Sequence, residues 1–220
     1  MRRALLLSVA IALVAAACSN SEPSQAAAAE VPTEAVARWF EAVENGDVDE
    51  AAATTVDGAL AIVLALENDM DSSEMSSLVV DGVPEDLAGA YWASFRQEFA
   101  DFAGRPISTL RVGGYREFEA QGVDYAAVTI IGRSDTEGTV YTRLEDEGGW
   151  AVDLLATVGS GFVGVMQRSY ESIPEGEEGD AAREAFRELA APSLWAILAS
   201  GGADDGFTRE AFGFLELIGA

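Results

Sequence analysis

The spacing of apolar residues predicts helices in the first third of the chain. In TEAVARWFEAVENGD the apolar side chains recur at intervals of three and four residues, which places them on one stripe of a helix: Val36, Trp39, Phe40 and Val43. We expect this helix to run from Thr33, whose hydroxyl can cap its start, to Gly46. A second, short helix should follow, capped by Asp47, and a third should cover Leu60 to Leu66.

A longer helix with an aromatic stripe is predicted next. It begins after Pro84 and ends at Gly104, and its large apolar residues lie three or four positions apart: Leu87, Tyr91, Phe95, Phe99 and Phe102. We interpret the stripe as the face that covers the core. The alternative is that it lines a ligand pocket, and the side chains that would then surround the ligand are Trp39, Tyr91, Phe95, Phe99 and Trp150.

From Pro106 the apolar period changes to two residues, which predicts β-strands. Four strands are expected, over residues 107–119 with a bulge at Gly113–Gly114, 123–132, 139–144 and 150–156. Short turns join them, so they should form an antiparallel meander with one buried face. Asp124 and Asp153 fall on strands. Asp153 alternates away from its apolar neighbours, so we expect it on the solvated face.

Helical periodicity returns after the last strand. We expect helices over residues 163–170 and 181–199, the second interrupted by Pro192, a charged loop over 174–180, and a final helix capped by Thr208. The pattern therefore predicts an α+β fold, with N-terminal helices packed on a curved four-stranded antiparallel meander and additional C-terminal helices. We divide it into a domain over residues 33–160 and a helical extension over residues 161–220 that packs on this domain.

The start of the chain has the composition of an export signal. Arg2 and Arg3 precede a short apolar run and the small residues Ala15–Ala17, so we interpret residues 1–17 as a signal peptide. Cys18, the only cysteine, follows directly. This segment resembles the lipobox of bacterial lipoproteins, although Ala15 stands where that family usually has leucine. The resemblance implies that the Cys18 thiol carries acyl chains such as palmitate and that the mature protein begins there.

A lipidated Cys18 would anchor the protein in the cell membrane, at the extracytoplasmic face of a bacterial membrane, because several acyl chains together hold a protein stably on a bilayer. Residues 18–32 would then contain the lipidated cysteine and a flexible linker. The alternative is an ordinary secreted protein with a free cysteine. A lone exposed thiol in an oxidising compartment invites unwanted pairing, which favours a modified Cys18.

Acidic residues dominate the composition and restrict the partners. The chain has 38 Asp and Glu against 13 basic residues, all of them Arg, and a net charge of −25. Loss of Arg2 and Arg3 with the signal peptide would change this charge to −27. Such a surface repels nucleic-acid phosphates and anionic lipid headgroups. We therefore expect no nucleic-acid partner, and membrane contact through the N-terminal lipid.

The sequence contains neither His nor Lys, which restricts the chemistry further. Without His there is no Ser–His pair and no histidine-ligated zinc, and without Lys there is no Schiff base and no Walker lysine. We expect no cofactor and no metal. Any catalysis would depend on carboxylates, Tyr, Ser, Thr or Arg.

Two short motifs are interpreted as structural. Gly159, Gly161 and Gly164 match a dinucleotide-binding fingerprint that lies after a predicted strand, but no apolar strand follows to complete a βαβ unit. Asp69–Glu74 begins like a calcium loop, yet its sixth position is Glu74 where the loop needs glycine. We interpret this second segment as the Ser-rich end of a helix.

Two stretches carry a resemblance to a known fold. AVARWFEAVENGDVDEAA resembles the opening helix of the nuclear transport factor two-like, or ketosteroid-isomerase-like, cone fold. YAAVTI followed by TVYTRLEDEGGWAVDLL is similar to its closing hairpin, where a Gly-Gly-Trp turn begins the last strand. The resemblance covers about Thr33 to Ala156 and implies a pocket between sheet and helices. Its catalytic members use a pocket carboxylate with acid or phenol donors; we assign no catalytic residue here.

These expectations describe a membrane-anchored extracytoplasmic lipoprotein, non-enzymatic rather than an enzyme, that binds a small apolar ligand or a partner protein. One alternative is a small isomerase or hydratase that uses a carboxylate and Tyr, and another is a structural component of envelope assembly. A pocket with a buried carboxyl group of raised pKa beside a Tyr would favour the enzyme, whereas a filled core would favour the structural role.

Overall fold

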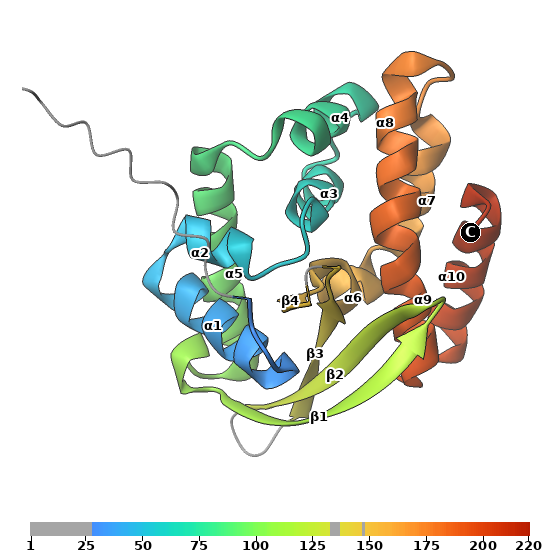
Figure 1. Ribbon diagram of the computed structural model, residues 1–220. Helices are drawn as coiled ribbons and strands as arrows, with labels where there is room; N and C mark the ends of the chain where they lie inside the picture. The colour runs from blue at the N-terminus through green and yellow to red at the C-terminus, as the bar shows by residue number, and fades with distance from the viewer. Residues whose placement is uncertain (1–27, 133–136, 147) are drawn as a thin grey trace, which may run out of the picture.

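Helices lie on both sides of a curved β-sheet in the computed structural model of the protein (Figure 1). The structure describes residues 28–132, 137–146 and 148–220; the predicted signal peptide, Cys18 and residues 19–27 of the predicted linker lie outside them. The sheet has four strands in the order β1-β2-β3-β4, and all its pairs are antiparallel. The predicted α+β class, with helices before and after a four-stranded meander, is confirmed.

The helices before the sheet begin and end largely where the sequence predicts. They are α1 (Pro32–Asn45), α2 (Val48–Ala53), α3 (Ala59–Glu67), α4 (Ser72–Asp81) and α5 (Glu85–Ala103). Proline suits the first turn of a helix, so α1 begins at Pro32, and its N-cap is Val31 rather than the predicted Thr33. Gly46 ends α1 with a φ of 69°, and Asp47 caps α2 by accepting a hydrogen bond from the Glu50 N–H, as predicted.

Helix α4 was not predicted. Its N-cap is Asp71, whose carboxylate accepts hydrogen bonds from the N–H groups of Ser73 and Glu74, both at 2.9 Å. The Glu74 carboxylate accepts from the Asp71 N–H in return, which completes a capping box. The segment Asp69–Glu74 therefore starts a helix, and our interpretation of it as a helix end is wrong.

The two outer strands, β1 and β4, are shorter than predicted, whereas β3 begins two residues earlier than predicted. The four strands are β1 (Arg111–Ala120), β2 (Val123–Ile131), β3 (Glu137–Leu144) and β4 (Trp150–Val152). The register of β1 against β2 shifts between Val112 and Tyr115, which confirms the bulge at Gly113–Gly114. β4 ends after three residues because Asp153 caps the next helix, α6 (Leu154–Val158), so the predicted strand over 150–156 is wrong beyond Val152.

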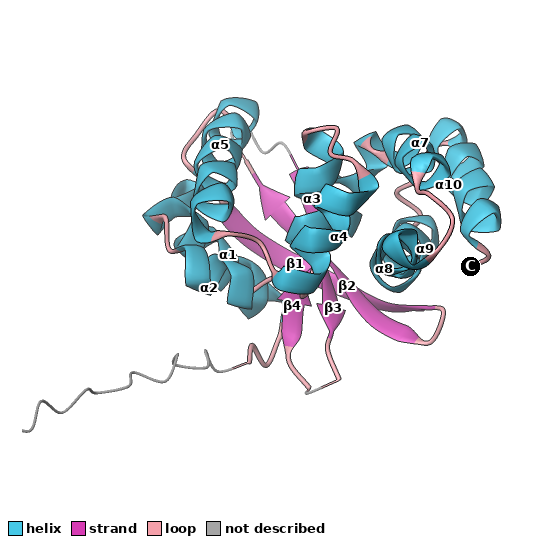
Figure 2. Ribbon diagram, turned by 90° about the horizontal axis from the view of Figure 1, so that it is seen from above, coloured by secondary structure: helices cyan, strands magenta, loops and turns pink. Residues whose placement is uncertain are grey.

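Both faces of the sheet are buried, in contrast to the single buried face that we predicted. Adjacent residues of one strand point to opposite faces, and Val140 and Tyr141 of β3 are both buried, as are Tyr125 and Ala126 of β2. Helix α1 packs on the face of Val140. The C-terminal helix α9 (Ala191–Ser200) covers part of the face of Tyr141, and Figure 2 shows α1 and α9 on either side of the strands.

The C-terminal helices supply this second cover. After α6 come α7 (Val163–Ser172), α8 (Glu177–Ala185), α9 and α10 (Asp205–Ile218). α8 continues into α9 through a π-helical turn over Phe186–Ala190, so the predicted helix with an interruption near Pro192 becomes one rod with a widened turn. The N-cap of α10 is Asp204 and not Thr208.

One hydrophobic cluster runs from Val36 of α1 to Ile218 of α10 and includes buried residues of the sheet. The apolar face of α10 folds back onto it through Phe214, Leu215 and Ile218. The glycine fingerprint at Gly159–Gly164 joins α6 to α7, so helix rather than strand precedes it. Within the described ranges, no helix combines the length and the apolar character that crossing a bilayer requires.

Candidate functional site

Four of the five residues that we predicted as possible pocket lining are joined by ring contacts that centre on Phe95. The ring of Phe95 lies 5.4 Å from that of Trp39, 6.0 Å from that of Tyr91 and 5.5 Å from that of Phe99, measured between centroids. Phe40 and Trp92 join the same group. These six side chains, which we call the α1–α5 aromatic cluster, pack the two helices together.

Burial affects the one titratable group of this cluster. Desolvation raises the pKa of the Tyr91 hydroxyl, and the charges of Glu67 and Glu98 raise it further. Tyr91 therefore stays protonated at neutral pH, as a hydrogen-bond donor and not as a base.

Trp150, the fifth predicted residue, has no ring contact with the aromatic cluster among the described residues and lies in β4, the last strand of the sheet. Its backbone N–H donates to the carbonyl of Ala29, and the segment at Thr54–Val56 pairs with the neighbouring Val152. Next to this strand is a cleft of about 370 Å³, bordered by Ala29, Arg38, Thr55, Asp57, Glu145 and Trp150, which we call the β4-edge cleft. It combines an aromatic side chain with several carboxylates.

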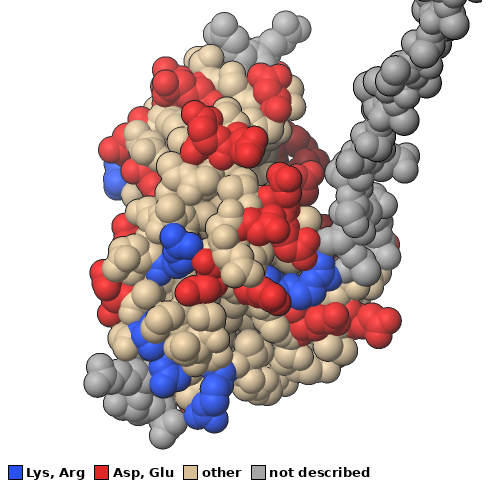
Figure 3. All heavy atoms as spheres, turned by 90° about the vertical axis from the view of Figure 1, so that its left-hand side faces the viewer, with Lys and Arg blue, Asp and Glu red and all other residues tan. Residues whose placement is uncertain are grey.

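The charges around the β4-edge cleft are partly paired. Arg38 forms an ion pair with Glu50 at 2.6 Å, and Arg143 forms one with Glu145 at 2.7 Å. Asp57 and Asp146 also border the cleft and are exposed. Figure 3 shows acidic side chains over much of the face that α1, α2 and α5 present, with arginines among them.

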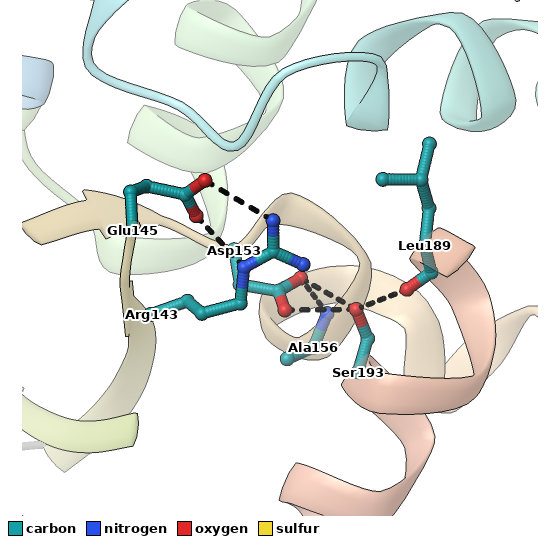
Figure 4. Close-up of polar contacts among 6 residues, drawn as sticks. All are labelled: Arg143, Glu145, Asp153, Ala156, Leu189 and Ser193. Atoms are coloured by element: carbon teal, nitrogen blue, oxygen red, sulfur yellow. Dashed lines mark hydrogen bonds and ion pairs between the residues drawn. The ribbon is translucent and has the colours of Figure 1, made fainter. Parts of the chain in front are cut away.

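The most unusual polar group of the described chain is Asp153, which lies between the sheet and α9 (Figure 4). It is 1% exposed, although we predicted it on the solvated face. The reason for the error is that the strand ends before it: Asp153 is the N-cap of α6, and its Oδ1 accepts a hydrogen bond from the Ala156 N–H at 2.8 Å. The period of two that we extended to residue 156 does not hold there.

Ser193 of α9 faces this carboxyl group. Its Oγ lies 2.9 Å from Asp153 Oδ1, 2.8 Å from Asp153 Oδ2 and 2.9 Å from the carbonyl oxygen of Leu189. Ser193 is buried as well. The side chains of Asp153 and Ser193 thus connect the end of β4 to a helix 40 positions further along the chain.

Arg143 and Tyr125 complete the surroundings of Asp153. The Arg143 guanidinium donates to both oxygens of Glu145, at 2.7 Å and 3.2 Å, so its charge is largely matched by that carboxylate. Tyr125 is fully buried on the adjacent strand, and its hydroxyl has no hydrogen-bond partner among the described residues. Asp153 therefore shares its site with one paired cation and one phenol.

These surroundings favour the neutral form of both acids. Burial raises the pKa of Asp153, while the Ala156 N–H, the Ser193 hydroxyl and Arg143 lower it by a smaller amount, and Glu145 adds to the rise. Burial also raises the pKa of Tyr125, and the nearby Asp153 raises it further.

Sequence reasoning missed this centre. Asp153 could have been recognised as a helix cap, because Asp is among the preferred N-cap residues and the apolar run Leu154–Ala156 follows it. Ser193 carries no comparable signal, since its partner lies far away in the sequence.

The described residues contain no group of three or more potential metal-ligating side chains. Comparison of the chain with protein-family models, with curated proteins and with solved structures gives no match.

Proposed function

We propose that this protein is a lipoprotein anchored at the extracytoplasmic face of a bacterial membrane, and that it binds a partner protein without catalysing a reaction. The anchor rests on the lipobox-like sequence at Cys18. Ala29, eleven residues further along, already pairs with β4, and eleven extended residues span about 40 Å. Such a tether would hold the domain near the bilayer.

The single observation that favours surface binding is the packing of the α1–α5 aromatic cluster. The rings of Trp39, Tyr91 and Phe99 each contact that of Phe95, and these four are the side chains that an apolar ligand would have needed as a pocket. A partner that docks on the outside fits this packing better than a ligand inside it. The strong negative charge selects partners with a basic surface.

The β4-edge cleft is the part of the surface that we propose for this contact. Trp150 offers an aromatic face to a guanidinium or ammonium group, and Asp57, Glu145 and Asp146 offer carboxylates. An arginine or lysine side chain of the partner matches both features.

Catalysis by Asp153 is the second candidate, because a carboxyl group of raised pKa lies near the phenol of Tyr125. A catalytic base must reach a proton of the substrate. Asp153 is 1% exposed, and both its oxygens already lie within 2.9 Å of Ser193 Oγ. We therefore assign this group to the architecture and not to chemistry.

Replacement of Cys18 by serine tests the anchor. In a bacterial host that processes lipoproteins, we expect the parent chain to take up a palmitate analogue and to sediment with membranes. Cys18→Ser should lose both the label and the membrane association, because serine has no thiol to acylate. A Cys18→Ser chain that stays membrane-bound and matures normally would refute the anchor.

Charge removal in the cleft tests the binding surface. We expect the double variant Asp57→Asn/Asp146→Asn to bind a fluorescent Arg-rich peptide about 2- to 30-fold more weakly at physiological salt, since exposed ion pairs contribute roughly 0.2–1 kcal/mol each. Fluorescence anisotropy measures this. The control Asp86→Asn/Asp101→Asn removes the same charge from exposed positions of α5. Equal weakening by both variants would mean that net charge, and not the cleft, attracts the peptide.

A further inference from the structure

The Ser193 hydroxyl lies close to more oxygen atoms than its single proton can serve. A serine hydroxyl has one proton to donate. Here three oxygens lie within 2.9 Å of Ser193 Oγ: both carboxyl oxygens of Asp153 and the carbonyl of Leu189. If Asp153 were ionised, all three would be acceptors, and a single proton would have to serve them. Two close oxygen–oxygen contacts would then have no hydrogen between them.

A protonated Asp153 relieves this shortage. Its Oδ2 makes the shortest of the three contacts, 2.8 Å, and accepts no hydrogen bond from Ala156, so it is the oxygen that can carry the proton. Oδ2–H then donates to Ser193 Oγ, and the Ser193 hydroxyl donates to the Leu189 carbonyl. Oδ1 still accepts from the Ala156 N–H. Two protons now serve the three contacts, and no negative charge is buried.

We infer that Asp153 and Ser193 form an acid-dependent clasp, in which a neutral carboxyl group donates to the serine and holds α9 against the sheet. The charged and titratable groups that face it are Arg143 and Glu145, from the end of β3 and the turn after it, and Tyr125 from β2. Both oxygens of Glu145 accept from one edge of the Arg143 guanidinium, its Nε and Nη2 groups, so the positive charge near Asp153 is already matched by another carboxylate.

The clasp has a defined direction of pH dependence. Because the pKa of Asp153 in the folded protein lies above its ordinary value of 3.8, the folded state holds this proton more tightly than the unfolded state. The stabilisation is complete below about pH 3.8, falls as the pH rises, and is lost above the folded-state pKa. The clasp therefore tightens in acid and loosens towards alkaline pH.

Asp153→Asn is the variant that tests the clasp. Asparagine keeps the shape, can accept from Ala156 with its oxygen and donate to Ser193 with its amide, and cannot ionise. Urea unfolding of the full chain and the variant between pH 4.5 and 8 gives the ratio of their unfolding constants. We expect this ratio, parent over variant, to rise with pH, in total by up to tenfold for each unit by which folding raises the pKa.

Asp204→Asn is the matched control. Asp204 caps α10 in the same way, by accepting from the Phe207 N–H at 2.8 Å, but it is exposed. The same comparison with this variant should show no rise with pH. A flat ratio for Asp153→Asn, or an equal rise for Asp204→Asn, would overturn the clasp.

Infrared spectroscopy gives a reading that does not depend on stability. Below the pH at which that ratio levels off, the folded parent chain should show the carbonyl band of a protonated carboxylic acid, which Asp153→Asn removes and Asp204→Asn leaves in place. Ser193→Ala should keep this band but shift it, since the acid loses its acceptor. If the parent chain lacks this band at pH values below the point at which the ratio levels off, Asp153 is ionised there and the inference fails.

Discussion

Replacing Trp39 with alanine will lower the free energy of unfolding by about 3–5 kcal/mol, the usual cost of removing a large buried aromatic side chain. Trp39 is 0% exposed, and its ring contacts three neighbours of the α1–α5 aromatic cluster: Phe40 at 5.3 Å, Phe95 at 5.4 Å and Trp92 at 6.3 Å. Alanine would leave a cavity that these rings, held on two helices, can close only in part. Urea unfolding followed by far-ultraviolet circular dichroism measures the loss.

Two variants separate packing from other causes. Trp39→Phe keeps a ring in the cluster and removes an indole N–H that has no partner among the described residues, so it should cost less than Trp39→Ala. Trp195→Ala removes a half-buried tryptophan whose described ring contact is with Phe212, and its cost should also be smaller. If Trp39→Ala costs no more than Trp195→Ala, the cluster is not the packed core described above, and a ligand pocket becomes the better interpretation.

Phe214→Ala should produce the second large loss, again about 3–5 kcal/mol of unfolding free energy. Phe214 is 0% exposed, and its ring lies 6.0 Å from Tyr170 of α7 and 5.7 Å from Phe186 in the π-helical turn. It therefore attaches α10 to two other helices. Differential scanning calorimetry should show a lower midpoint and, if unfolding stays two-state, a single transition.

The same helix offers a control for Phe214. Phe212 stands two residues earlier, is 49% exposed and has one ring contact described, with Trp195 at 5.6 Å. Phe212→Ala should change the free energy of unfolding by no more than about 1 kcal/mol. Similar losses for the two variants would mean that α10 does not dock through the face that carries Phe214.

Elements with a strong local signal were predictable. The period of α1, the stop at Gly46, the cap at Asp47 and the glycine bulge in β1 all depend on residues close together in the sequence, and the structure has each of them. The four-strand meander follows for the same reason, because short turns leave antiparallel pairing as the simple outcome.

The wrong predictions lie in segments where two local sequence patterns favour different structures. Asp71 and Glu74 form a capping box, yet the serines between them suggested a helix end. Asp153 fits an alternating pattern through residue 156, but its carboxyl group caps the next helix and ends the strand. In both places an acidic side chain that satisfies backbone N–H groups decided the structure.

The second buried face and the Asp153 centre depend on contacts that are distant in sequence. The sequence around Tyr125 and Tyr141 does not indicate that these strand residues are buried. The Asp153–Ser193 contact joins positions 40 apart. Nothing in a single sequence states which helix will cover a sheet face. The predicted anchor at Cys18, in contrast, depends on no distant contact but on a short contiguous motif.

The π-helical turn between α8 and α9 sets the phase of a continuous helical rod. α8 packs on α4, whereas α9 packs on the sheet, so the two halves of the rod bury different sides. A π-helical turn accommodates one extra residue, and each residue of an α-helix advances the direction of the side chains by about 100°. With uniform α-helical pitch over residues 177–200, Ser193 would rotate by about that angle away from Asp153. The extra residue therefore lets one continuous helical segment pack on α4 with its first half and on the sheet with its second half, which an unbroken α-helix would not do.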